Sequence, residues 1–115
     1  MGPTPLSLPQ FIALMAIETA RIENEALRRR AVARYLPPWP VQLIRSDQAD
    51  HPHYVGWVFA ESADQAEGAV YCNRGRADGP ARWAIVDLRA RTFDTGTLWF
   101  EHAADALAAW LGEDT

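Results

Sequence analysis

Three closely spaced prolines divide the sequence into two parts of different character. Pro37, Pro38 and Pro40 cannot donate a backbone hydrogen bond, and each disfavours helical geometry in the residue before it. A helix that reaches this segment from the N-terminal side must therefore end by Leu36. Helical periodicity precedes the prolines, whereas short apolar runs separated by turn residues follow them. We expect the proline segment to form a corner between a helical layer and a layer of strands.

The segment before the prolines predicts one long N-terminal helix or two stacked helices. Ser7 is the expected N-cap, Pro9 is tolerated in the first turn, and Gln10 follows Ser7 by three residues, as a capping box requires. Apolar residues at helical spacing predict the buried face, which consists of Ile12, Met15, Ile22, Ala26, Ala33 and Leu36, widened by Phe11, Leu14, Leu27 and Val32. The outer face is expected to carry Glu18, Arg21, Glu25 and Arg29.

Five short runs after the prolines are rich in β-branched and aromatic residues and predict strands. They are residues 41–45, 54–60, 68–74, 82–90 and 97–101. Asp78-Gly79 lies between the third and fourth runs and suits a hairpin turn, so a meander is the simplest connection. A short C-terminal helix then buries Leu107, Trp110 and Leu111 and ends at Gly112.

The predicted fold class is therefore α+β. A long N-terminal helix and a short C-terminal helix pack on a four- to five-stranded antiparallel sheet. The 115 residues suit one domain with its own hydrophobic core, so we assign residues 1–115 to a single domain.

The charge of the chain limits the classes of partner that it can bind. The formal net charge is −4, with six arginines and three acidic residues in positions 1–45 but five arginines and twelve acidic residues in positions 46–115. An acidic surface repels phosphate backbones, so general nucleic-acid binding is not expected. The single cysteine, Cys72, has no disulfide partner, and the apolar run at 11–17 is too short to cross a bilayer. We expect a cytoplasmic protein that does not bind membranes.

The histidines and the cysteine are the candidate metal ligands and catalytic residues of this chain. His51 and His53 lie two residues apart beside acidic residues, in a pattern that can bind zinc or nickel, but His102 and Cys72 complete no recognisable four-ligand spacing. Cys72 with His102 could form a nucleophile pair, yet a cysteine inside a predicted strand is usually a small apolar filler. We predict no enzyme activity, no cofactor and no metal. The alternative is a small metal-dependent enzyme that uses His51, His53 and His102.

Three consecutive arginines, residues 28–30, could bind an anion. On a helix, however, three successive residues span most of the circumference and cannot form one patch. A solvated helical face is the favoured interpretation.

The chain is rich in tryptophan, with Trp39, Trp57, Trp83, Trp99 and Trp110 all in its last two-thirds. Successive residues of a strand point to opposite faces, so Trp99 and Phe100 cannot both enter the same layer. The same alternation places Trp57 and Phe59 on one face. Exposed tryptophan among acidic residues is typical of a protein recognition patch, but burial under helices on both faces is equally compatible with the sequence.

Residues 56–112 carry a resemblance to a known family. The pieces "GWVFAESAD", "WAIVDL", "TGTLWFE" and "ALAAWL" resemble the SMI1/KNR4-like (SUKH) domains, many of which are bacterial immunity proteins that neutralise a cognate toxin. The resemblance implies toxin binding as the function and implies no catalytic residues.

These observations together predict an immunity-type protein that binds a basic toxin domain through an acidic, aromatic surface. The candidate contacts are Trp57, Asp64, Glu67, Asp78, Asp94, Trp99 and Glu101. The alternative binding function is a small homodimeric adaptor or chaperone-like protein that pairs through its long helix or an edge strand.

Overall fold

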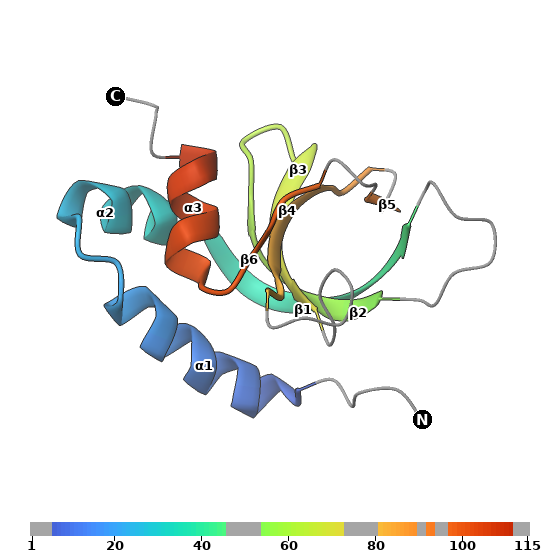
Figure 1. The fold of residues 1–115 in the computed structure, drawn as a ribbon, viewed down its shortest axis with the longest axis horizontal. Helices are drawn as coiled ribbons and strands as arrows, with labels where there is room; N and C mark the ends of the chain where they lie inside the picture. The colour runs from blue at the N-terminus through green and yellow to red at the C-terminus, as the bar shows by residue number, and fades with distance from the viewer. Residues whose placement is uncertain (1–5, 46–53, 73–80, 90–91, 94–96, 112–115) are drawn as a thin grey trace.

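The structure, a computed structural model, describes residues 6–45, 54–72, 81–89, 92–93 and 97–111. The elements in chain order are α1 (Leu8–Ala20), α2 (Glu25–Arg34), β1 (Tyr35–Arg45), β2 (Tyr54–Glu61), β3 (Glu67–Cys72), β4 (Trp83–Asp87), β5 (Thr92–Phe93), β6 (Trp99–Phe100) and α3 (Ala103–Leu111). The helices pack against the outer side of a strongly curved sheet (Figure 1). The predicted α+β class is confirmed.

The N-terminal helical segment is two helices. The capping box at the start of α1 is confirmed, because Ser7 Oγ accepts from the Gln10 N–H at 3.3 Å and Gln10 Oε1 accepts from the Ser7 N–H at 2.9 Å. A second N-cap, Asn24, accepts from the Leu27 N–H at 3.0 Å and begins α2. α2 ends at Arg34, before the prolines, as predicted. Within the described residues, no helix has both the length and the apolar character needed to cross a bilayer.

The buried face of the helices differs from the predicted one. Phe11, Met15, Ile22, Leu27 and Ala31 are buried, as is the charged residue Glu18. Ile12, Ala26, Val32 and Ala33, which the spacing placed in the buried face, are exposed, Ile12 by 52 %. These assignments and that of Glu18 to the outer face are wrong. α1 is rotated so that Phe11 enters an aromatic core and Glu18 reaches the start of α3.

The sheet closes into a ring. Strands β1 to β4 form the predicted antiparallel meander. β5 pairs with β4 and, in parallel, with the end of β1 through Ile44–Thr92 and Arg45–Phe93. These pairings close β1 to β5 on themselves, and β6 adds to β4 (Figure 1).

The prolines do not form the corner that the sequence predicts. They lie in the first half of β1. Pro37 and Pro38 fall where the register with β2 shifts, between Tyr35 and Trp39, and Pro40 follows the shift, opposite Trp57. Proline lacks the N–H that a regular ladder uses but is compatible with extended geometry, so it is tolerated at such an irregularity.

Ring closure produces two hydrophobic clusters, one on each side of the strands. The inner cluster contains Val41, Leu43, Val58, Val70, Cys72, Ala84, Val86 and Leu88, with Trp39 and Trp99 packed against it. The outer cluster joins the strands to the helices and is built around Phe11, Phe59, Trp83 and Leu107. Trp99 thus faces the inner cluster and Phe100 the outer one, which confirms that the two residues enter different layers.

Candidate partner-binding surface

The turn between β2 and β3 presents an ordered acidic group. The Asp64 carboxylate accepts from Ser62 Oγ at 2.6 Å and from the Ala66 N–H at 3.1 Å. These hydrogen bonds, the one from Ser62 first, lower the pKa of Asp64 below its usual value. Asp64 is fully exposed, so the turn presents a negative charge to solvent at neutral pH.

Glu67 begins β3 immediately after this turn and adds a second negative charge. Its N–H donates to Ser62 Oγ at 3.1 Å, which connects its backbone to the Asp64 turn. Its pairing partner across the sheet is another acidic residue, Asp87 of β4. Like charges directly opposite each other on neighbouring strands are destabilising. Arg89 is close enough for its charge to lower the pKa of Asp64 as well, so this acidic group already has a cationic neighbour.

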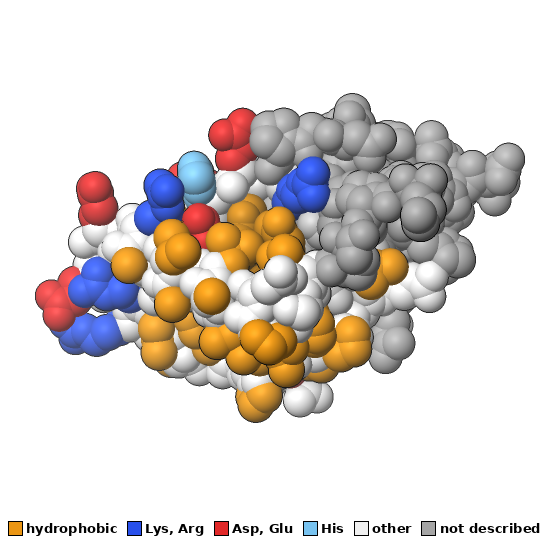
Figure 2. Space-filling view, turned by 90° about the horizontal axis from the view of Figure 1, so that it is seen from below, with side chains coloured by type: hydrophobic (Ala, Val, Ile, Leu, Met, Phe, Trp, Pro, Cys, Tyr) orange, Lys and Arg blue, Asp and Glu red, His pale blue; other side chains and the backbone are white. Residues whose placement is uncertain are grey.

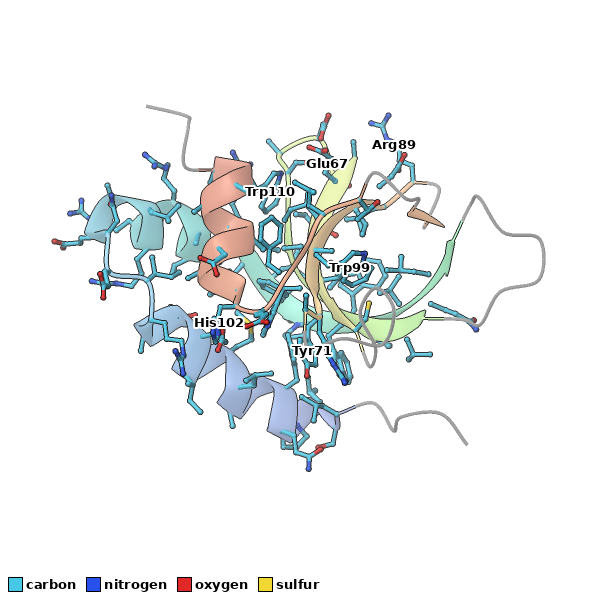
Figure 3. All side chains as sticks on the ribbon, in the orientation of Figure 1. Glu67, Tyr71, Arg89, Trp99, His102 and Trp110 are labelled. Atoms are coloured by element: carbon cyan, nitrogen blue, oxygen red, sulfur yellow. The ribbon has the colours of Figure 1, made fainter. Side chains whose placement is uncertain are left out.

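A pocket of about 260 Å³ lies beside Glu67, where α3 meets β4 and β6. We call it the α3 pocket, and its lining consists of Glu67, Ile85, Thr97, Leu98, Phe100, Ala109 and Trp110. Glu67 and Trp110 lie at the same end of the molecule (Figure 3). Leu98 is 67 % exposed, more than any other large hydrophobic residue that the structure describes. The pocket therefore combines apolar and aromatic walls, an acidic rim and an exposed apolar side chain.

The predicted contact residues are only partly brought together by the fold. Asp64 and Glu67 share one turn. Trp57 lies under the start of α1, where its Nε1–H donates to the Leu6 carbonyl at 3.0 Å and its ring stacks on Phe11 with centroids 6.1 Å apart.

Two further predicted contacts are not among the residues that line the α3 pocket. Trp99 lies within the curve of the sheet (Figure 3). Glu101 is exposed just before α3. The other two predicted contacts, Asp78 and Asp94, lie outside the described residues.

The pocket residues Leu98, Phe100 and Trp110 were missed by the sequence reasoning. The helical spacing of Trp110 did identify it as a residue that faces the sheet, but it gave no sign of an opening beside it.

Cys72 and His102, the two described residues among the catalytic candidates, lie in different parts of the fold. Cys72 belongs to the inner cluster, as its predicted filler role requires, and burial raises the pKa of its thiol to about 12. The thiol is therefore protonated at neutral pH. His102 lies just before α3, among the residues that join the helices, and His51 and His53 lie outside the described residues. Across the part of the chain that the structure describes, no three metal-ligating side chains gather.

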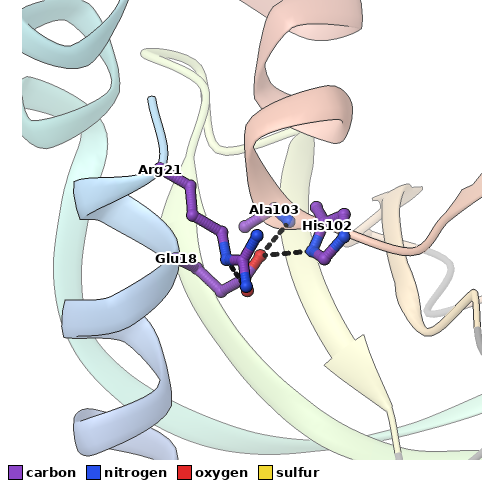
Figure 4. Close-up of polar contacts among 4 residues, drawn as sticks. All are labelled: Glu18, Arg21, His102 and Ala103. Carbon is purple, nitrogen blue, oxygen red and sulfur yellow. Dashed lines mark hydrogen bonds and ion pairs between the residues drawn. The ribbon is translucent and has the colours of Figure 1, made fainter. Parts of the chain in front are cut away.

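Glu18 positions α3, and therefore one wall of the α3 pocket. Its Oε1 accepts from the N–H of Ala103, the first residue of α3, at 2.8 Å (Figure 4). His102 Nδ1 lies 3.5 Å from the same oxygen, and Arg21 Nε lies 3.5 Å from Oε2. The carboxylate satisfies a backbone donor that the helix cannot pair internally, at the positive end of the helix dipole. Glu18 thus connects the end of α1 to the start of α3.

A second surface, on the outer side of α1, is apolar. Leu8 and Ile12, one turn apart, are exposed on one side of α1, and Ile17 is exposed further round the helix. The only charged residue within α1, Glu18, is buried. Figure 2, which views the molecule from the side of α1, shows hydrophobic side chains gathered over this face, with charged groups toward one end and one edge. An apolar hollow of about 180 Å³ adjoins it, lined by Ile12, Met15, Tyr35, Leu36, Pro38 and Phe59.

The structure thus offers two candidate binding surfaces, the α3 pocket with its acidic rim and the outer face of α1. The resemblance of residues 56–112 to SMI1/KNR4-like domains stays a prediction from the sequence. The chain matches no family model, and no curated protein or solved structure matches it significantly.

Proposed function

We propose that this protein is an immunity-type inhibitor that binds and neutralises a cognate bacterial toxin in the cytoplasm. The binding surface is the α3 pocket, and the partner is a basic toxin domain. The observation that carries the proposal is the position of Glu67, whose side chain lines a pocket with the aromatic residues Phe100 and Trp110.

The composition of the pocket is that of an interface centre with a polar rim. Binding energy at protein interfaces concentrates in a few apolar or aromatic anchors that lose water, surrounded by polar groups. Leu98, Phe100 and Trp110 supply the apolar centre, and Glu67 supplies the acidic rim. Asp64 adds a second negative charge in the turn just before Glu67. A basic toxin surface that places an apolar side chain in the pocket would satisfy both parts.

The charge of the chain supports the same partner. The formal net charge is −4, and twelve of the fifteen acidic residues lie in positions 46–115. Opposite charge accelerates association well above the rate of neutral partners, and salt screens this effect. We therefore infer a partner with a positively charged surface, and association that slows as salt is added.

Charge reversal at the pocket rim is the direct test of this function. Glu67→Lys is expected to weaken binding to the toxin domain encoded by the neighbouring gene by about 2–5 kcal/mol, because it places two like charges in contact. Isothermal titration calorimetry measures the affinity. Co-expression of the two genes measures protection from the toxin, which the variant should lose.

A matched control separates the pocket from net charge. Glu23→Lys makes the same charge change at an exposed residue between α1 and α2. It should retain binding and protection. Equal loss in both variants, or full protection by folded Glu67→Lys protein, would contradict the proposed surface.

The outer face of α1 favours a second candidate function, a homodimeric adaptor or chaperone-like binding protein. An uncharged apolar helix face can meet its own copy without like-charge repulsion. If this function is correct, light scattering at low micromolar concentration will give a dimer mass, and Ile17→Asp will give a monomer. Leu98→Asp, which alters an even more exposed apolar residue at the α3 pocket, should leave the dimer intact. A monomer mass for the unmodified protein would reject this candidate.

A further inference from the structure

The three consecutive arginines of α2 have three different environments. Arg28 Nη1 donates to the Ile22 carbonyl at 2.8 Å, so this side chain supports the connection between α1 and α2. Arg29 pairs with Glu25 one turn earlier, with 3.3 Å between Nη2 and Oε1, and both side chains are exposed. Among the described residues, Arg30 has neither a hydrogen bond like that of Arg28 nor an ion pair like that of Arg29.

Arg30 lines a pocket together with a second arginine. The pocket has a volume of about 270 Å³ and is lined by Arg30, Ala33, Arg34 and Leu111. Arg30 and Arg34 are four residues apart, so their side chains lie on the same face of α2 and repel each other. No acidic residue is among these lining residues. Among the lining residues that the structure describes, the pocket thus gathers two positive charges and no negative charge.

One polar atom of the Arg30 and Arg34 side chains has no hydrogen-bond partner. Arg30 Nε is shielded from solvent and donates no hydrogen bond. Buried polar groups in folded proteins almost always have a partner, and the exceptions often mark a place where a water or an ion binds. The position of Arg34 in the last turn of α2 is explained by the negative end of the helix dipole, but this does not explain Arg30, one turn earlier.

We propose that this pocket binds a phosphate-type oxyanion between Arg30 and Arg34. A guanidinium group presents a planar fork of donors that matches two oxygens of such an anion. Because the Arg30 Nε–H is shielded from solvent, we expect the Arg30 side chain to turn toward the pocket when the anion binds. A phosphate offers enough oxygens to engage both arginines and enough charge to offset their repulsion. The volume also accommodates the group to which a phosphate ester is attached. The site lies between α2 and the end of α3 and is separate from the α3 pocket.

Titration of the full chain with inorganic phosphate tests this site. With chloride used to hold the ionic strength constant, calorimetry should show binding of one phosphate with a dissociation constant below roughly 10 mM. Arg30→Gln and Arg34→Gln should each weaken it at least about tenfold, since each removes a charged donor. Arg29→Gln, which removes the neighbouring arginine, should bind phosphate as the unmodified protein does. Acetate should bind more weakly than phosphate.

Three results would overturn the proposal. One is the absence of phosphate binding to the unmodified protein in this range. Another is a loss of phosphate affinity in Arg29→Gln as large as that in Arg30→Gln, which would indicate that net charge alone attracts the anion. The third is acetate binding as tight as phosphate binding, which would exclude phosphate as the preferred class.

Urea unfolding in chloride buffer establishes that each variant is folded. Arg30→Lys provides a second variant, which keeps the charge but lacks the Nε–H. Its binding should lie between that of Arg30→Gln and the unmodified protein.

Discussion

Phe11→Ala is expected to lower the free energy of unfolding by about 3–5 kcal/mol, the usual loss when a large aromatic side chain is removed from a core. Phe11 is completely buried, and its ring centroid lies within 5.8–6.2 Å of four other aromatic rings. Those rings are Trp57, Phe59, Tyr71 and Trp83. They come from three strands, so the cavity left by alanine has walls that cannot readily collapse. Urea unfolding followed by far-UV circular dichroism measures the change.

The neighbouring residue provides the control. Ile12→Ala removes an apolar side chain from the same turn of α1, but that side chain is half exposed and should change stability by no more than about 0.5 kcal/mol. Phe11→Leu should lie between the two, because leucine fills part of the space. Similar losses for Phe11→Ala and Ile12→Ala would mean that the packing of α1 on the sheet contributes little.

These two residues also show how far the helical pattern can be interpreted. Periodicity and capping residues are local, so the sequence correctly predicts that α1 begins after Ser7 and that helix ends before the prolines. The rotation of the helix about its axis depends on what it packs against. Phe11 and Ile12 are both large and apolar, and only the aromatic cluster on the strands determines which of them is buried.

For the strands, too, the sequence predicts what depends on nearby residues and misses what depends on residues far apart in the chain. Composition and turn spacing predict strands β1 to β4 and their antiparallel order. Ring closure depends on two residue pairs between the end of β1 and β5, which are far apart in the sequence. No local pattern encodes such a pairing, and the prolines in the extended part of β1 suggested a corner instead.

The candidate site was predicted as an acidic, aromatic surface, but the aromatic residues of the α3 pocket are not the predicted ones. Acidic residues at 64 and 67 are visible in the sequence, and the fold places them in one turn. Their neighbours in the α3 pocket come from β4, from the residues that lead into β6, and from α3. The pocket exists only when α3 has docked on the strands, so its lining could not be deduced before the position of α3 was known.

The position of α3 depends in turn on a residue that the sequence reasoning placed on the wrong face. Glu18→Ala is expected to lower the free energy of unfolding by about 2–3 kcal/mol, because it removes a hydrogen bond to a charged group and leaves the buried Ala103 N–H without an acceptor. The loss should be concentrated at the start of α3. Urea unfolding measures the total change, and hydrogen exchange of the Ala103 amide, followed by NMR, should show faster local opening in the variant.

Two matched variants identify the cause. Glu23→Ala removes an exposed carboxylate close to Glu18 in sequence and should change stability by no more than about 0.5 kcal/mol. Glu18→Gln retains an oxygen that can accept from Ala103 but loses the charge at the helix N-terminus, so it should cost about 1 kcal/mol. A glutamine variant as unstable as the alanine variant would show that the charge matters more than the acceptor. Unchanged exchange at Ala103 in Glu18→Ala would show that α3 is held by its apolar face alone.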